Sequence, residues 1–176
     1  VNYDKLRVRA YRVTPADWQA YLAYRDNLYR DKSATPPGKE VINTVIDVQG
    51  KPDTLTETSI DLTPALGGKP GQLIVVVDKP GSILSLFMPS YDYVVQSWVQ
   101  STNIGLDAIN DSTQLVAWAT RLIDGTPLPE TTLELQPSGV QALTAVDGLA
   151  RFELSDSPAT IMVATNGDDL AILPRS

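Results

Sequence analysis

The sequence predicts a mainly β fold: two antiparallel β-sandwich domains, the first of which carries one inserted α-helix. Short runs rich in Val, Ile, Thr and Leu follow one another along most of the 176 residues, separated by Gly, Pro and Asp-Gly turn signals. Only one segment, near the N-terminus, has helical spacing together with helix-start signals. Residues 1–92 hold 11 Lys+Arg against 11 Asp+Glu, whereas residues 93–176 hold 3 against 10. This change in charge indicates two domains with separately evolved surfaces.

The first domain begins with a strand and a helix. Residues 5–13 alternate apolar and charged side chains with a period of two, which predicts a half-buried strand. A helix is predicted over residues 15–30, because Thr14 can cap its N-terminus, Pro15 fits the first helical position and Asp17 can complete a capping box. Its apolar side chains recur at helical spacing: Trp18, Tyr21, Leu22, Leu28 and Tyr29.

Three strand-like segments and a linker complete the first domain. We predict strands over 41–48, 55–62 and 72–78, the last of them central and fully buried. Residues 79–92 are bounded by Pro, Gly and Ser and are predicted to be a linker, so the first domain spans 1–92. Because apolar residues in a linker need cover, we predict that five of them contact the other domain or a partner: Ile83, Leu84, Leu86, Phe87 and Met88.

The second domain, residues 93–176, is predicted to be a seven-stranded sandwich. Asp124-Gly125, Asp147-Gly148 and Asn166-Gly167 supply the positive φ that tight hairpins need. Trp98 and Trp118 have apolar neighbours at strand spacing and are predicted to lie in the sandwich core. The predicted strands are 94–106, 114–122, 131–136, 140–146, 149–154, 160–164 and 170–173.

The composition excludes most catalytic chemistry. The chain has no Cys and no His, so neither a Ser-His-Asp or Cys-His arrangement nor a Cys/His zinc site can be built. We predict no catalytic, cofactor-binding or metal-binding residues and no enzymatic activity. The scattered arginines of the acidic half are unsuited to nucleic acid. No apolar run approaches the roughly 18 residues of a membrane span, so no membrane contact is predicted. The strand acids are predicted to face solvent: Glu40, Asp47, Glu57, Asp61, Glu134 and Glu153.

Two binding functions remain as alternatives. Loop acids of a sandwich can bind Ca²⁺, although Asp is also a common turn residue. Exposed aromatic rings stack on sugars, although a Trp at helical spacing with Leu more often packs in a core. The acids are Asp107, Asp111, Asp124, Asp147, Asp156, Asp168 and Asp169, and the rings are Tyr3, Tyr11, Trp18, Tyr21, Tyr24 and Tyr29.

Several stretches resemble bacterial α2-macroglobulins. Trp98–Asp107 and Leu115–Leu128 resemble a strand, a hairpin and a Gly-x-Pro-Leu turn of a macroglobulin-like domain. Asp147–Phe152 is similar to the family's Asp-Gly-Leu-Ala-x-Phe turn and strand, and Gly167–Leu173 to its closing strand. The resemblance extends to a preceding domain through Leu6–Val13, Pro15–Tyr29, Thr56–Leu62 and Gly71–Val77.

The resemblance implies two consecutive macroglobulin-like, or fibronectin-III-like, domains that act as non-catalytic scaffold in a protease-trapping inhibitor. The chain begins at Val1 and shows no signal peptide, so we expect a segment of a longer polypeptide. Members of the family are large periplasmic or membrane-tethered proteins, and many capture proteases through a Cys-Gln thioester, which this Cys-free segment does not hold. The implied partners are neighbouring domains of the parent chain and, for the whole protein, target proteases, in the periplasm or outside the cell. The alternative function is a ligand-binding surface module, either an adhesin or a carbohydrate-binding sandwich.

Overall fold

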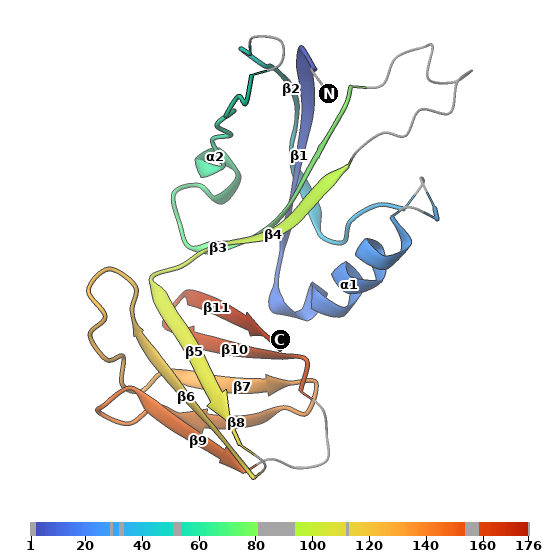
Figure 1. The fold of residues 1–176 in the computed structure, drawn as a ribbon. Helices are drawn as coiled ribbons and strands as arrows, with labels where there is room; N and C mark the ends of the chain where they lie inside the picture. Colours follow the sequence, from blue (N-terminus) through green and yellow to red (C-terminus); the bar gives the residue numbers. More distant parts are fainter. Residues whose placement is uncertain are drawn as a thin grey trace. The chain divides into compact units, whose positions relative to one another are not determined.

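The computed structural model describes residues 3–28, 30–31, 34–50, 54–80, 94–111, 113–153 and 159–175. The chain divides into two compact units, residues 1–99 and 100–176, called the first and second unit below (Figure 1). Strands make up most of the regular structure in both units, so the predicted mainly β fold is confirmed.

The first unit is built on one sheet of four strands in the order β2-β1-β3-β4. The central strand β1 pairs antiparallel with β2 and with β3, and β3 is buried over most of its length, as predicted for a central strand. The strands are β1 (Lys5–Val13), β2 (Lys39–Asp47), β3 (Gly71–Asp78) and β4 (Val95–Ser101).

The helix of the first unit begins where the sequence predicts. A short 3-10 turn, η1 (Pro15–Asp17), leads into α1 (Trp18–Asn27). The Asp17 carboxylate accepts hydrogen bonds from the backbone N–H of Thr14 over 2.8 Å and from its hydroxyl over 3.0 Å, which fixes the N-terminus. The helix ends at Asn27 rather than at the predicted residue 30, and the N–H groups of Arg30 and Asp31 both donate to the Asn27 carbonyl.

The predicted strand over 55–62 is wrong. This segment is irregular and leads into a short helix, α2 (Thr63–Leu66), whose first turn is fixed by a hydrogen bond from the Thr63 N–H to the Asp61 carboxylate. Ile60 and Leu62 still reach apolar cover, because they pack against the face of the sheet that carries Val8 and Leu73. The alternating apolar residues of this segment are therefore buried by side-chain contacts with the sheet, without pairing of its backbone with a strand.

The sheet of the first unit is covered on both faces. On one face Val8, Ala10, Leu73 and Val75 form a core with Ala65 of α2. On the other face α1 packs its rings against β4. Among the described residues of this unit there is one sheet, so helices and an irregular segment occupy the layers that a second sheet would fill.

The second unit is a two-sheet antiparallel sandwich. One sheet has the order β11-β10-β7-β8 and the other β5-β6-β9. Leu133 and Ala164 from the first of these sheets and Ala117 and Phe152 from the second meet in a common buried core. The strands are β5 (Ile104–Asn110), β6 (Gln114–Arg121), β7 (Thr132–Gln136), β8 (Val140–Leu143), β9 (Leu149–Glu153), β10 (Ile161–Asn166) and β11 (Asp169–Pro174).

The predicted strand 94–106 is two strands. β4 ends at Ser101 and joins the sheet of the first unit, and β5 starts at Ile104 in the second. The chain leaves extended pairing at Thr102 and Asn103, where Asp169 accepts hydrogen bonds from both residues. The chain accordingly divides between the two units at 99/100, whereas the predicted boundary is 92/93.

Candidate functional site

The predicted contact residues of the linker lie outside the described residues. Ile83, Leu84, Leu86, Phe87 and Met88 all fall between residues 81 and 93, so their contact with another domain or partner stays a prediction. The described features that could form a site are the ring cluster under α1, the charged face of the first sheet and the loops of the second unit.

The aromatic residues of the first unit form a core cluster. Trp98 of β4 contacts the rings of Trp18 and Tyr21, with ring centroids 5.2 and 5.4 Å apart. Its indole N–H also donates to the Gln72 side chain over 2.7 Å. Tyr11 and Tyr24 are buried as well. Trp18, Tyr21, Tyr11 and Tyr24 therefore offer no open platform for stacking on a sugar. Of the other two rings of the carbohydrate-binding alternative, Tyr3 is partly exposed and Tyr29 lies outside the described residues.

Both predicted sandwich-core tryptophans lie elsewhere. Trp98 belongs to the first unit and is half-buried beneath α1. Trp118 is half-buried on β6, between the fully buried Ala117 and Ala119. Since successive side chains of a strand point to opposite faces, Trp118 lies on the outer face of its sheet. Apolar neighbours along a strand thus did not reveal which face the tryptophan occupies.

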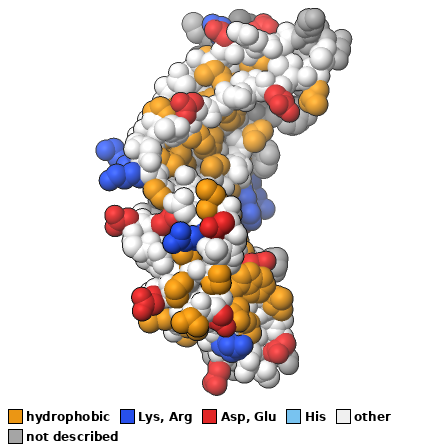
Figure 2. All heavy atoms as spheres, turned by 90° about the vertical axis from the view of Figure 1, so that its left-hand side faces the viewer, with side chains coloured by type: hydrophobic (Ala, Val, Ile, Leu, Met, Phe, Trp, Pro, Cys, Tyr) orange, Lys and Arg blue, Asp and Glu red, His pale blue; other side chains and the backbone are white. Residues whose placement is uncertain are grey.

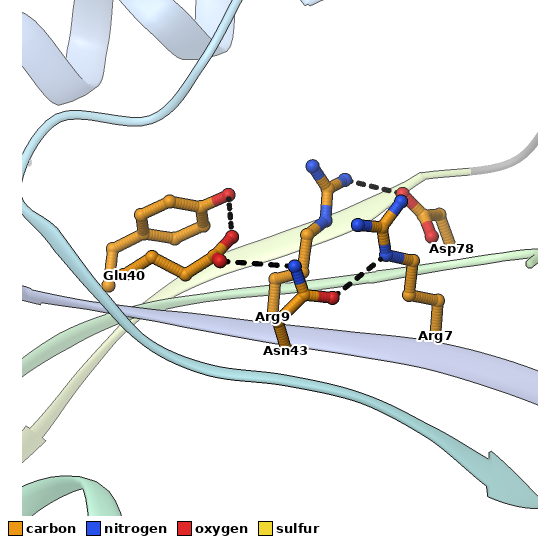
Figure 3. Close-up of polar contacts among 6 residues, drawn as sticks. Arg7, Arg9, Glu40, Asn43 and Asp78 are labelled. Atoms are coloured by element: carbon orange, nitrogen blue, oxygen red, sulfur yellow. Dashed lines mark hydrogen bonds and ion pairs between the residues drawn. The ribbon is translucent and has the colours of Figure 1, made fainter.

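A chain of polar contacts crosses the face of the first sheet (Figure 3). Arg9 pairs with Asp78 over 2.5 Å, and their side chains are only 21% and 16% exposed. Beside this pair, Arg7 donates to Asn43 over 3.1 Å, and Asn43 donates to Glu40 over 3.0 Å. These contacts join β1 to both of its neighbours, β3 and β2.

Tyr11 extends these polar contacts, and Tyr24 of α1 lies near them. The Tyr11 hydroxyl donates to Glu40 over 3.2 Å. Burial raises the pKa of Tyr11, and burial likewise raises the pKa of Tyr24 on α1, against the lowering effect of the nearby Arg9 charge. Among the described residues, Arg9 Nε and Asp78 Oδ1 are buried and make no hydrogen bond. The group therefore contains one ion pair and several hydrogen bonds, and these contacts join β1 to β2 and β3.

The strand acids make separate contacts. Glu40 bonds to Tyr11, Asp47 pairs with Lys5 over 3.5 Å, and Glu134 accepts from two glutamines. Glu57 and Glu153 are exposed, as predicted, and Asp61 holds the first turn of α2. Within the described ranges no three His, Cys, Asp or Glu residues come together in a way that could hold a metal ion.

Three of the predicted loop acids of the second unit cap turns, and Asp156 lies outside the described residues. Asp111 accepts from the N–H groups of Thr113 and Gln114, and Asp124 accepts from the N–H and hydroxyl of Thr126. These hydrogen bonds hold the pKa of both carboxyls below its usual value. Asp147 makes the corresponding contact with the Leu149 N–H over 3.0 Å. Their carboxylate oxygens thus accept hydrogen bonds within turns, which is the alternative to Ca²⁺ binding given for these residues above.

Exposed apolar side chains occur where two turns of the second unit adjoin. Leu122 and Ile123 are 65% and 92% exposed in the β6–β7 connection, and Val146 is 89% exposed in the β8–β9 turn. The turns are neighbours because the Ala119 N–H donates to the Gly148 carbonyl over 2.9 Å. Hydrophobic side chains also gather at other places on the surface in Figure 2. These residues are not among the predicted site residues. Their position directly before Asp-Gly turns is a signal in the sequence that could have indicated exposed apolar side chains.

No helix in the described part of the chain has the length and hydrophobicity needed to cross a membrane. No family model and no curated protein matches the sequence.

Solved structures do match the fold. The crystal structure of native α-2-macroglobulin from Escherichia coli spanning domains NIE-MG1 matches with a TM-score of 0.73 and 18% identity, covering 99% of this chain and 85% of that one. The structure spanning domains MG0-NIE-MG1 matches with a TM-score of 0.69 and 17% identity, over 100% of this chain and 56% of that one. The trypsin-activated E. coli protein gives a TM-score of 0.66 at 18% identity, over 99% of this chain and 12% of that one.

This chain therefore spans about half of the MG0-NIE-MG1 structure and about one eighth of the trypsin-activated chain. The identity in each comparison is below one fifth, so the likeness is one of fold. At that level the predicted resemblance is confirmed: the chain has a fold similar to that of domains NIE-MG1 of E. coli α-2-macroglobulin.

Proposed function

We propose that this chain is a non-catalytic scaffold segment of an α2-macroglobulin-like endopeptidase inhibitor that traps proteases. The observation that supports the proposal is the extent of the structural match: the structure of domains NIE-MG1 covers 99% of the chain, which includes both units. A single shared sandwich would be weak support, because sandwiches serve many functions. A match that covers two unlike units is more specific.

Within this proposal each unit has its own counterpart. The first unit, with its single sheet and α1, corresponds to NIE, and the second unit, with its two-sheet sandwich, corresponds to MG1. Their partners are the neighbouring domains of the parent chain. Target proteases meet the whole protein, which acts in the periplasm or outside the cell, with or without a membrane tether.

The contacts of both units support a structural role. The buried charges of the first unit are paired across strands, and its aromatic rings are packed. In the second unit the Asp side chains hold turns. The residues grouped by these contacts stabilise the units, as a scaffold role requires.

The test begins with the parent protein. It should be several times longer than this chain, and after incubation with trypsin it should suppress cleavage of casein while trypsin still cleaves a small chromogenic peptide. This pattern distinguishes a trap from an active-site inhibitor, because a trapped protease excludes only large substrates. The 176-residue chain alone, added at the same concentration, should leave both activities unchanged. A parent formed by these two units alone, or inhibition by the isolated chain, would contradict the proposal.

A further inference from the structure

The sheet β5-β6-β9 of the second unit has a largely apolar outer face. Its inner side chains pack in the core of the sandwich: Leu106 and Ala108 of β5, Leu115 and Ala117 of β6, and Ala150 and Phe152 of β9. Because successive side chains of a strand point to opposite faces, the residues between these point outward. Six of the outward residues form the outer patch: Asp107, Ile109, Val116, Trp118, Leu149 and Arg151.

Strand pairing sets these six side chains in two rows of three. One row crosses β5, β6 and β9 at Ile109, Val116 and Arg151, and the next row crosses them at Asp107, Trp118 and Leu149. The four apolar side chains are therefore neighbours, while the one acid and the one base of the patch stand at opposite corners. Ile109 is 66% exposed, and Asp107 and Arg151 are exposed as well.

The two corner charges of the outer patch make no ion pair within the described residues of the chain. Asp107 accepts one hydrogen bond, from the N–H of the next residue, Ala108, over 2.8 Å. Apolar side chains that lie together at a surface with polar groups around them are typical of a protein–protein contact. A partner for this patch needs a matching apolar centre and the opposite charge at each of the two corners.

A second copy of the same patch meets both requirements. We propose that the outer patch binds the outer patch of a second copy of this chain, face to face, across a two-fold axis that crosses the line from Asp107 to Arg151 at right angles. With strands about 4.8 Å apart and rows about 6.8 Å apart, this axis places Asp107 of each copy over Arg151 of the other. It also places Val116 over Ile109 and Trp118 over Leu149, in both directions. The strands of the two copies then cross at roughly 70°, close to the orthogonal class of sheet packing.

Other two-fold arrangements lose this match. An axis parallel to the strands places Asp107 over Leu149 and Ile109 over Arg151, and an axis across the strands places Ile109 over Asp107 and Leu149 over Arg151. Each of these buries a charge against an apolar side chain, which is costly. The diagonal axis gives a closed contact, so it produces a dimer and no fibre. A patch of six side chains is small for a specific interface, so the dimer is weak and dissociates at the low-micromolar concentrations of spectroscopic assays.

Sedimentation equilibrium tests the apolar centre. Between about 10 µM and 1 mM the apparent mass of the native chain should rise from 19.1 kDa towards twice that value. Ile109→Ser should weaken dimerisation about tenfold or more, because each dimer loses two buried isoleucine side chains. Ile123→Ser is the matched control, since it makes the same change at a side chain that is 92% exposed in a turn outside the patch, and it should leave dimerisation unchanged. Circular dichroism checks that both variants are folded. A native chain that stays at 19.1 kDa, or equal effects of the two changes, overturns the proposal.

Mixing two charge variants tests the two-fold axis. Asp107→Arg and Arg151→Asp should each weaken dimerisation about tenfold, because two exposed pairs per dimer change from attraction to repulsion. An equimolar mixture of the two variants should dimerise as the native chain does, since both corners of the mixed dimer again join opposite charges. Arg175→Asp, at an exposed position of the other sheet, changes the net charge as Arg151→Asp does and should leave dimerisation unchanged. A mixture that dimerises no better than its components shows that residues 107 and 151 do not face each other and contradicts the proposal. These results are independent of protease inhibition, so they do not bear on the proposed function.

Discussion

The side-chain amide of Gln100 holds both backbone groups of Ile172. The Ile172 N–H donates to Gln100 Oε1 over 2.9 Å, and Gln100 Nε2 donates to the Ile172 carbonyl over 3.2 Å. Ile172 lies in β11, at the end of its four-stranded sheet. A side chain thus bonds to this sheet edge as a neighbouring strand would, and it fixes the chain where the second unit begins.

Replacing this amide should destabilise the second unit. Gln100→Leu keeps a side chain of similar length but leaves the N–H and C=O of Ile172 without these bonds, so we expect a loss of about 1–2 kcal/mol in the free energy of unfolding. Urea unfolding followed by Trp118 fluorescence, in a background where Trp18 and Trp98 are Phe, measures the second unit alone. Gln114→Leu, at an exposed position, should change stability by less than about 0.5 kcal/mol. Equal effects from the two changes would show that the Gln100 contact adds no stability.

Asp169 should matter for a related reason. Its carboxylate accepts hydrogen bonds from the Thr102 hydroxyl over 2.8 Å and from the Asn103 N–H over 2.7 Å, at the start of the second unit. Asp169→Asn keeps the shape but removes one acceptor oxygen and the charge, so we expect a cost of about 1–2 kcal/mol. The adjacent Asp168→Asn changes the net charge equally at an exposed position and should be near neutral. The same fluorescence assay distinguishes them, and a costly Asp168→Asn would instead indicate a general charge effect.

The two half-buried tryptophans should respond differently to substitution. Trp98→Phe removes the hydrogen bond to Gln72 and alters the ring contacts with Trp18, so we expect the first unit to lose about 1–2 kcal/mol. Trp118 has no recorded ring or hydrogen-bond partner in the described part of the chain, and Trp118→Phe should cost less than about 0.5 kcal/mol. Thermal unfolding followed by circular dichroism checks the order. A larger cost at Trp118 would mean that its outer face is covered.

The first unit should weaken in alkali. Burial raises the folded-state pKa of Tyr11 and Tyr24 above the usual value of 10.0. Below pH 10 the phenols are protonated in both states and their full contribution to stability is present. Above pH 10 the unfolded chain loses these protons first, so the free energy of unfolding falls as the pH rises through the folded-state pKa. Urea midpoints measured between pH 9 and 11.5 should fall less steeply for Tyr24→Phe than for the native chain, and equal slopes would contradict the prediction.

Local patterns predicted several elements well, because the relevant forces are local. The alternation of residues 5–13 coincides with β1, and Thr14, Pro15 and Asp17 start the helix where expected. The apolar run in 72–78 is the buried strand β3. The Asp-Gly and Asn-Gly pairs occupy turns with positive φ at Gly125, Gly148 and Gly167. In each case neighbouring residues supply both the signal and the structure.

Contacts between distant residues account for the failures. The segment 55–62 has the composition of a strand, but its apolar side chains are buried by the face of a sheet whose strands come from other parts of the sequence. The strand predicted over 94–106 is divided because Asp169, more than sixty residues away, captures Thr102 and Asn103. The outward position of Trp118 depends on which face of β6 meets the core, and both faces carry apolar residues.

The sequence by itself determined the mainly β class, the helix start, the turns, the lack of Cys and His chemistry and the family that the fold resembles. Tertiary structure alone decided that the rings under α1 are core, that Arg9 of β1 pairs with Asp78 of β3, and that β2 is an edge strand of its sheet. The physical reason is that propensity and capping act within a few residues, whereas burial, pairing and register depend on which distant segments meet.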